Sequence, residues 1–183
     1  MSILYIPIGT TGSGKTTYYE KNYKQRKDIE RISADDVRFK LLDYEHTGRD
    51  YEESLEPTVW STVYATYTER LKAKESVYFD CTNLTLKERS QIIIRALRTQ
   101  QYKIELIWFD IPLWIALKWN AQRERRIKEK IIAQQYLRLE PPQEYEYDSL
   151  MILGYDPIAE VLIQTEYRKG ELVSKPLKIS QLS

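Results

Sequence analysis

The sequence lacks the features that mark several classes of protein. Its single cysteine, Cys81, has no partner for an internal disulfide, which fits a reducing compartment. No apolar run approaches the roughly 20 residues of a membrane-spanning helix. Residues 1–8 lead directly into a motif, with no basic segment before it and no cleavage site after it. We therefore expect a soluble, cytoplasmic protein.

An excess of charge of either sign is also absent. The 28 Lys and Arg residues balance 27 Asp and Glu residues, which gives a formal net charge of +1. Proteins that coat long nucleic acids usually carry a strong basic excess, so any nucleic acid contact should be local, such as one chain end held in a pocket. With one histidine and one cysteine, the chain has no cluster of ligands for a structural zinc ion.

Apolar runs alternate with helical periodicities along residues 1–153, as in a parallel sheet covered by helices on both faces. The predicted strands are 3–8, 29–33, 76–81, 103–109 and 149–153. The predicted helices are 15–23, 35–43, 57–71, 85–101, a helix opened by Pro112, and 128–137. Residues 44–53 are expected to form a loop. The pattern predicts an α/β domain with about five strands.

Some side chains are assigned to the core by their spacing. Val37, Leu41 and Leu42 should face inward from the second helix, and Leu86, Ile93 and Leu97 mark one face of the fourth. The tryptophans lie on apolar stripes, so we expect core packing for Trp60, Trp108 and Trp114.

The C-terminal segment, residues 154–183, differs from the rest. Val161–Tyr167 and Leu172–Ile179 flank Arg168, Lys169 and Gly170, a pattern typical of a β-hairpin. Pro176 would restrict the second strand to an edge. We expect a domain over 1–153 and an extension over 154–183 that packs on it as a hairpin.

A glycine-rich motif follows the first predicted strand and opens the first predicted helix. It matches G-x-x-x-x-G-K-[ST] at every fixed position, and a simple turn would explain neither its lysine nor its threonine. The backbone N–H groups of such a loop bind the phosphates of ATP, Lys15 reaches the β- and γ-phosphates, and the Thr16 hydroxyl coordinates Mg²⁺. The expected nucleotide-binding residues are Gly9, Thr10, Thr11, Gly12, Ser13, Gly14, Lys15, Thr16 and Thr17.

Carboxylates at the ends of the second and third predicted strands suit the acceptor side. Ligands of open α/β sheets bind at the carboxyl ends of the strands. Asp35 is our candidate general base for an attacking hydroxyl, whereas Asp36 is better explained as a helix cap. Asp80 could hold Mg²⁺ through water or orient the acceptor. Asn83 could contact substrate or merely start a turn.

A run of arginines after the fifth predicted helix could form a lid. Arginines on a lid stabilise the charge of the transferred phosphoryl group, and the lid excludes water. A solvated helix face is the alternative. We favour Arg123 and Arg126, three residues apart on one helical face, for the phosphate role within a lid over about 120–130, and assign Arg125 to solvent.

These four blocks, in this order, resemble the 5′-kinase domains of polynucleotide kinases, such as those of phage end-healing and bacterial RNA-repair enzymes. The matching blocks are residues 9–16, 33–38, 80–83 and 120–123. The resemblance implies a P-loop kinase fold with Asp35 as the base, Arg38 holding the acceptor strand, Arg123 as the lid arginine and Arg126 as a second basic residue. Asp80 and Asn83 are then substrate contacts.

Three functions remain open at this point. The resemblance favours transfer of the ATP γ-phosphate to a polynucleotide 5′-hydroxyl, at a DNA or RNA end. A nucleoside, sugar or antibiotic hydroxyl is the alternative acceptor. A non-catalytic nucleotide-binding module is a third possibility, although such a module needs no base. The N-K-x-D motif of GTPases is absent.

Overall fold

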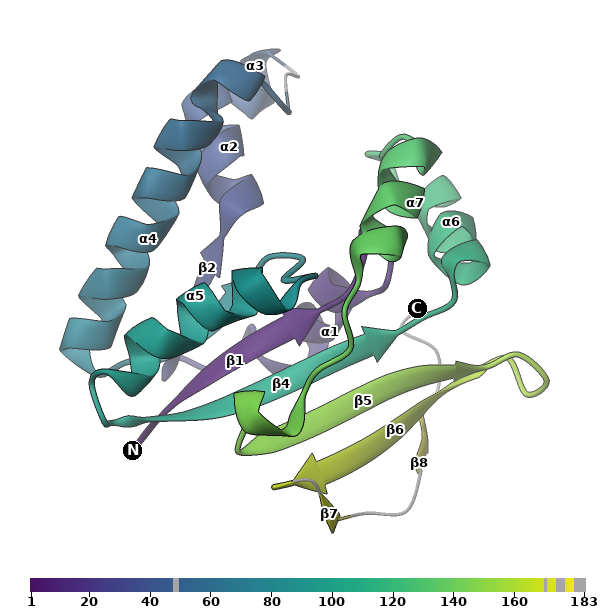
Figure 1. The fold of residues 1–183 in the computed structure, drawn as a ribbon. Helices are drawn as coiled ribbons and strands as arrows, with labels where there is room; N and C mark the ends of the chain where they lie inside the picture. The colour runs from purple at the N-terminus through teal and green to yellow at the C-terminus, as the bar shows by residue number, and fades with distance from the viewer. Residues whose placement is uncertain (48–49, 170, 174–176, 180–183) are drawn as a thin grey trace.

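The computed structural model describes residues 1–47, 50–169, 171–173 and 177–179 of the 183-residue chain. Within them, eight strands form one sheet in the order β2-β3-β1-β4-β5-β6-β7, and β8 also pairs with β6 (Figure 1). The strands are β1 Ser2–Ile8, β2 Ile29–Ser33, β3 Ser76–Asp80, β4 Tyr102–Asp110, β5 Ser149–Asp156, β6 Val161–Arg168, β7 Glu171–Leu172 and β8 Leu177–Ile179.

In the sequence, all seven α-helices of the described residues lie between β1 and β5. They are α1 Lys15–Asn22, α2 Ala34–Leu42, α3 Tyr44–Thr47, α4 Glu56–Ala73, α5 Leu86–Leu97, α6 Leu113–Ala121 and α7 Glu129–Arg138, with short 3-10 helices at Glu53–Leu55 and Glu144–Glu146. No helix in this part of the chain has the length and apolar character needed to cross a membrane.

Strands β1 to β5 are all parallel, which confirms the expected α/β class. The strand order reverses at β1, which lies between β3 and β4. The chain therefore leaves β1 toward one face of the sheet and leaves β3 toward the other face. Such a switch point opens a crevice at the carboxyl ends of the two strands. The glycine-rich loop lies at this point because it directly follows β1.

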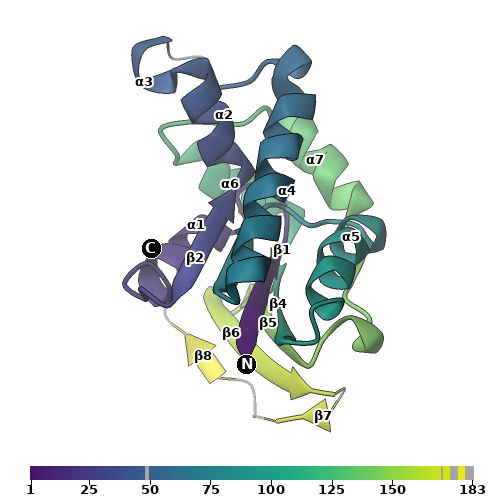
Figure 2. The same ribbon diagram turned by 90° about the vertical axis from the view of Figure 1, so that its left-hand side faces the viewer.

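Side chains alternate between the two faces of the sheet, and each face has its own core. Leu4 packs in the core that α4 and α5 cover, whereas Tyr5 packs in the core that α1 and α6 cover. Figure 2 shows α1 and α5 on opposite sides of the strands. Since both faces are covered, the central strands are apolar almost throughout, as the sequence predicted.

Two helical faces differ from the predicted ones. The buried stripe of α5 is Arg89, Ile92, Ile93 and Ala96, while Leu97 is 50% exposed. The capping box of Thr85 and Glu88 fixes where α5 begins and therefore which residues face the sheet. In α2, Leu41 is 44% exposed although Leu42 is buried. The predicted loop over residues 44–53 also contains α3, and a 3-10 helix begins at its last residue, Glu53.

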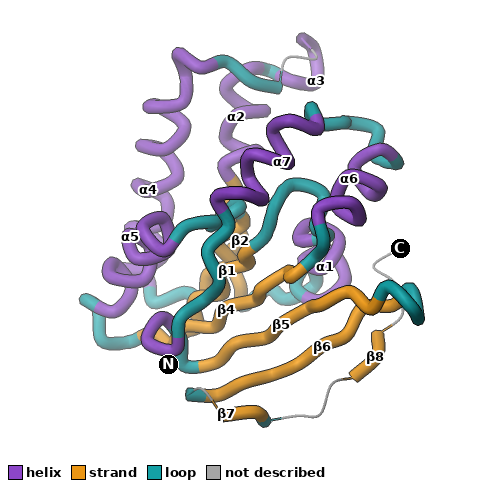
Figure 3. The backbone as a smooth tube through the Cα atoms, turned by 45° about the vertical axis from the view of Figure 1, so that its right-hand side comes forward, coloured by secondary structure: helices purple, strands orange, loops and turns teal. Residues whose placement is uncertain are grey.

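The C-terminal segment joins the main sheet. Strand β6 pairs antiparallel with β5 along its whole length, from Asp156–Val161 to Ser149–Arg168. Opposite β6, the second arm of the expected hairpin is divided into β7 and β8, on the far side of the sheet from β2 (Figure 3). Gly170 and Pro176 lie outside the described residues.

A buried ion pair joins segments that are far apart in the sequence. The side chains of Arg89 and Glu146 are 0% and 2% exposed, with Arg89 Nε donating to Glu146 Oε1 at 2.8 Å. The same guanidinium donates to the backbone carbonyls of Asn83, Leu84 and Glu140. Arg89 therefore fastens the turn after β3 to the segment that follows α7.

Removing this guanidinium should destabilise the fold strongly. In Arg89→Met, Glu146 becomes a buried carboxylate without its partner, and we expect a loss of about 3–5 kcal/mol in the free energy of unfolding. Urea unfolding followed by circular dichroism measures it. The control is Arg138→Met, which breaks the exposed pair with Glu88 and should cost less than about 1 kcal/mol. Equal losses in the two variants would contradict a central role for Arg89.

Candidate functional site

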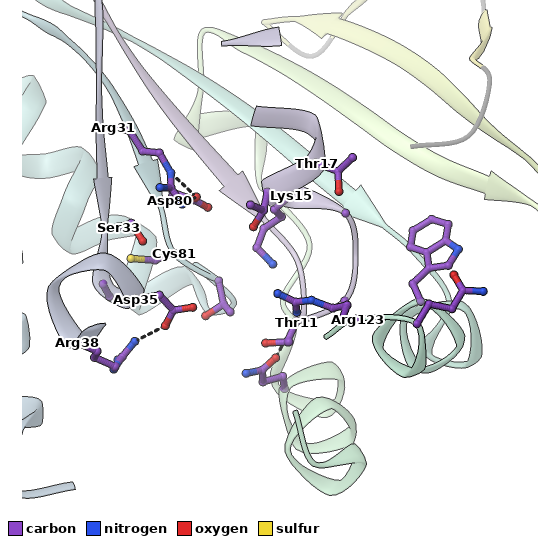
Figure 4. Close-up of a pocket in the computed structure, with 18 of the residues that line it drawn as sticks. Thr11, Lys15, Thr17, Arg31, Ser33, Asp35, Arg38, Asp80, Cys81 and Arg123 are labelled. Atoms are coloured by element: carbon purple, nitrogen blue, oxygen red, sulfur yellow. Dashed lines mark hydrogen bonds and ion pairs between the residues drawn. The ribbon is translucent and has the colours of Figure 1, made fainter. Parts of the chain in front are cut away.

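A cavity of about 460 Å³ lies at the carboxyl ends of β1, β2 and β3. The glycine-rich loop and α6–α7 form one wall, and the start of α2 with the end of β3 forms the other. In Figure 4, Lys15 and Arg123 face Asp35 and Asp80 across the cavity. The topology therefore brings together residues from all four sequence blocks.

The glycine-rich loop has the shape that a phosphate requires. Gly12 has φ of +83°, and a Cβ at this position would lie 2.5 Å from the carbonyl oxygen of Ala116 in α6. Gly14 precedes α1 with φ of 92°, and as a glycine it has no side chain to cap the first N–H groups of that helix. These N–H groups, together with the positive end of the helix dipole, can bind an anion.

Within this loop, the residues divide into two groups. Thr11, Gly12, Gly14, Lys15, Thr16 and Thr17 line the cavity. Gly9, Thr10 and Ser13 lie behind it: the carbonyls of Gly9 and Thr10 accept hydrogen bonds from Lys15 Nζ at 2.8 and 2.7 Å, and Ser13 is fully buried. The loop thus holds the lysine ammonium by hydrogen bonds to its own backbone carbonyls.

Lys15 is a buried cation of the site with a strongly lowered pKa. Its side chain is 9% exposed. Burial lowers its pKa to about 8, nearby Arg123 acts in the same direction, and Asp80 and Asp35 oppose the shift. A phosphate bound beside the ammonium would favour its charged form.

Asp35 is held by arginines from two elements. Arg38 Nη1 donates to Asp35 Oδ1 at 2.8 Å, and Arg125 Nη1 lies 3.6 Å from Asp35 Oδ2. Arg38 is itself fixed by a bidentate pair with Glu56 at the start of α4, at 2.6 and 2.8 Å. Asp35 is 52% exposed despite these contacts, so an entering hydroxyl can reach it.

Asp80 lies deeper in the site and is paired with Arg31. Arg31 donates to Asp80 Oδ2 through Nε at 2.8 Å, and its Nη2 lies 2.6 Å from the same oxygen. Arg31 also pairs with Asp36, whose backbone N–H is capped by Ser33. The carboxylate therefore faces the cavity in a fixed orientation.

The structure gives Asn83 a different place from the predicted substrate contact. Its side chain is 3% exposed and does not line the cavity. Its amide nitrogen donates to the carbonyls of Pro7, Phe79 and Cys81, at 2.8, 3.1 and 3.1 Å. With φ of 50°, it turns the chain after β3 and ties that turn to β1. Of the two roles considered for Asn83, substrate contact and turn formation, its position matches turn formation.

The lid is a loop, so the prediction that Arg123 and Arg126 share one helical face is wrong. Helix α6 ends at Ala121 and α7 begins at Glu129, and Asn120 holds the loop between them through two hydrogen bonds with Ile127. Arg123 lines the cavity as predicted. Arg126 is exposed, does not line the cavity, and donates only a 3.4 Å bond to the Arg123 carbonyl.

Several residues of the site were missed or misassigned in the sequence. Arg125, assigned to solvent, instead pairs with Asp50 at 2.7 Å and approaches Asp35. Trp60 packs against the core as predicted but also lines the cavity, whereas Trp114, assigned to the core, is 54% exposed. Further lining residues without a sequence signal of their own are Arg31, Trp119, Gln122 and Gln135.

Two of these residues have contacts that suggest a role. Gln135 of α7 accepts a hydrogen bond from the Thr11 backbone N–H at 2.7 Å, which links the lid to the phosphate loop. Trp119 packs edge-on against Tyr155, with ring centroids 6.2 Å apart. The sequence does place Trp119 one helical turn before Arg123, on the lid side.

The residues present fit a magnesium-bound nucleotide. Thr16 follows Lys15 at the uncapped start of α1, and Asp80 lies in the same cavity. Among the described residues, no three acidic, cysteine or histidine side chains gather as metal ligands. Mg²⁺ held mainly by phosphate oxygens, water and one hydroxyl does not require such a cluster.

Cys81 lines the cavity beside Asp35. Burial raises the pKa of its thiol to about 12, so the group is protonated and a poor nucleophile at neutral pH.

Comparison with known proteins places the fold. The model of the AAA domain family matches residues 4–142. The chain is similar to one in the Pnkp1/Rnl/Hen1 RNA repair complex, with 22% identity and a TM-score of 0.63 over 75% of this chain and 44% of that one. It is similar to one in the AvrRxo1-ORF1:-ORF2 structure with ATP, with 17% identity and a TM-score of 0.74 over 94% and 60%.

A third similar structure is a sugar kinase from Janibacter sp. HTCC2649, with 16% identity and a TM-score of 0.60 over 84% of this chain and 86% of that one. None of the curated proteins matches the sequence. The chain spans less than two thirds of the first two structures' chains. At these identities the likeness shows the fold, and it confirms the P-loop kinase architecture.

Nucleotide affinity should depend on the charge of Lys15. Because its pKa in the free protein is about 8 and bound phosphates raise it, binding takes up a proton above that pH. We expect the affinity for ADP to fall by up to about tenfold per pH unit above pH 8. Isothermal titration between pH 7 and 9.5 measures the slope.

The matched control is Lys15→Arg, which stays charged over the whole range and should flatten the slope. The same slope in wild type and Lys15→Arg would mean that another group titrates.

Proposed function

Since the chain belongs to the AAA domain family, we propose that it is a P-loop kinase that transfers the γ-phosphate of Mg-ATP to a hydroxyl group, with a polynucleotide 5′-hydroxyl as the leading acceptor. The observation that carries the proposal is the meeting of Asp35 and Lys15 across one cavity. A nucleotide-binding module has no need of a carboxylate base held opposite its phosphate loop.

The residues of the nucleotide side would act first. The uncapped N–H groups of the glycine-rich loop and α1 bind the phosphates, and Lys15 leaves the Gly9 and Thr10 carbonyls to reach them. Thr16 and, through water, Asp80 would hold Mg²⁺, which neutralises charge on the phosphates when bound. Trp119 offers an aromatic face on which the adenine base can stack.

Asp35 would then act on the acceptor. It accepts the proton of the attacking hydroxyl as the oxygen approaches the γ-phosphorus. Arg38, fixed by Glu56, keeps the carboxylate turned toward the cavity. Arg123 stabilises the negative charge that the phosphoryl group carries during transfer.

Two observations support a nucleic acid end as the acceptor. The four blocks resemble polynucleotide kinases in order and spacing, and one of the similar structures is an RNA repair complex. Trp60 lines the cavity with Asp35 and Arg38, where it could stack against a terminal base. The formal net charge of +1 limits the contact to a few terminal nucleotides.

A small hydroxyl compound is the second candidate acceptor. A sugar kinase has a similar fold over 86% of its own chain, which leaves little of that enzyme without a counterpart here. A cavity of about 460 Å³ also suits a small molecule together with the phosphates of the donor.

The deciding experiment is transfer from γ-labelled ATP with Mg²⁺ to 5′-hydroxyl DNA and RNA oligonucleotides, beside a panel of nucleosides and sugars. We expect label on the oligonucleotide 5′ end at about 1 per second or faster, and none with Lys15→Ala. Label on a small acceptor alone would replace the polynucleotide with that compound. No transfer to any acceptor would overturn the kinase assignment.

Substituting the base should separate chemistry from binding. In Asp35→Asn, the side chain keeps its size but cannot take a proton, so we expect kcat to fall by about 10²–10⁴-fold. The ATP affinity should change little, because the phosphates lie on the other wall. Asp36→Asn, one residue along the same helix, is the matched control and should retain transfer. Wild-type kcat in Asp35→Asn would remove Asp35 as the base.

A further inference from the structure

Arg125 is a lid side chain that reaches the opposite wall of the site. Its Nε lies 2.7 Å from Asp50 Oδ2, in the segment that precedes α4, and its Nη1 lies 3.6 Å from Asp35 Oδ2. Its guanidinium also packs over the ring of Phe39 in α2, 4.9 Å from the centroid. A charge pair, a second charge pair and a cation–π contact thus join the lid to the acceptor wall.

The helix that follows the lid, α7, contacts the phosphate loop. Gln135 of α7 accepts the hydrogen bond of the Thr11 N–H in the phosphate loop. In Figure 2 the loop between α6 and α7 passes beside α2. The lid loop therefore contacts the acceptor wall through Arg125, and α7, which follows the loop, contacts the phosphate loop through Gln135.

Within the described part of the chain, the neighbouring cations of the loop make no such contacts. Arg126 bonds only to the carbonyl of Arg123, and Lys128 is exposed at the start of α7. Arg125 is 24% exposed, although it lies in the middle of a charged loop. Its enclosure comes from the contacts with the acceptor wall, not from the loop itself.

We propose that Arg125 is a positioning residue that closes the lid over the acceptor wall, orients Asp35 for the entering hydroxyl, and keeps water from competing as the acceptor. The inference rests on the proposed transfer reaction and adds to it a residue that acts through Asp35. Because Asp35 is held between Arg38 and Arg125, its two oxygens have fixed partners, while its side chain, 52% exposed, remains open to an acceptor.

The test compares Arg125→Ala with Lys128→Ala, which removes an exposed cation from the same loop. Two rates are measured on each protein: phosphoryl transfer to the acceptor, and ADP release without acceptor. In Arg125→Ala we expect the KM of the acceptor and the ratio of hydrolysis to transfer each to rise about tenfold. The KM of ATP should stay close to wild type, and Lys128→Ala should match wild type throughout.

A third measurement needs no catalysis. Cys81 is the chain's single cysteine and lines the cavity beside Asp35, so its labelling by methyl methanethiosulfonate reports access to the acceptor wall. We expect labelling to be several-fold faster, on the order of threefold or more, in Arg125→Ala. Loss of a nearby cation would raise a thiol pKa and slow the reaction, so faster labelling reports opening.

Two milder variants distinguish loss of the Arg125 contacts from misfolding of Arg125→Ala. Asp50→Asn removes the Arg125 partner without touching the cavity lining, and it should shift all three readouts in the same direction but less. Arg125→Lys keeps the charge and loses the fork and the stacking, so partial recovery is expected.

Arg125→Ala that behaves like Lys128→Ala would overturn the inference. So would an equal rise in the KM values of ATP and acceptor, because Arg125 would then act on the nucleotide. If wild type transfers to no acceptor, the proposed function fails, and the Cys81 labelling rates still decide whether Arg125 closes the site.

Discussion

The site depends on a charge buried far from solvent. The Arg89 guanidinium pairs with Glu146 and donates to the carbonyls of Asn83 and Leu84, so the turn after β3 cannot move independently of α5. From the same turn, the Asn83 amide reaches Pro7, two residues before the phosphate loop. The start of the loop and the strand end that carries Asp80 are therefore positioned by one continuous network of buried polar contacts.

The two walls of the cavity carry opposite kinds of group. The nucleotide wall offers the backbone N–H groups at the start of α1 and the Lys15 ammonium, whereas Asp35 and Asp80 of the acceptor wall are each paired with an arginine. Lys15 shows the consequence, since burial lowers its pKa while the facing carboxylates oppose that shift. The negative charges of a bound triphosphate would pair with the Lys15 ammonium and favour its charged form.

What the sequence could predict follows from how local each signal is. The phosphate loop was located correctly because its residue types are dictated by its own backbone geometry. Arg125 was misassigned, and the cavity-lining side of Trp60 was missed, because both depend on which walls the topology brings together, and a charged or aromatic side chain has no local mark for that. The spacing of Arg123 and Arg126 misled because residues 122–128 are not helical.

The antiparallel strand β6 also changes the character of the sheet's edges. It covers the whole of β5, which would otherwise end the parallel sheet with a row of unpaired backbone groups. At the other edge, β2 is only five residues long and carries Glu30 and Arg31. Short length and charge both oppose backbone pairing of β2 with a strand of another molecule. The fold therefore resists self-assembly differently at its two edges: β6 covers β5 at one, and β2 is short and charged at the other.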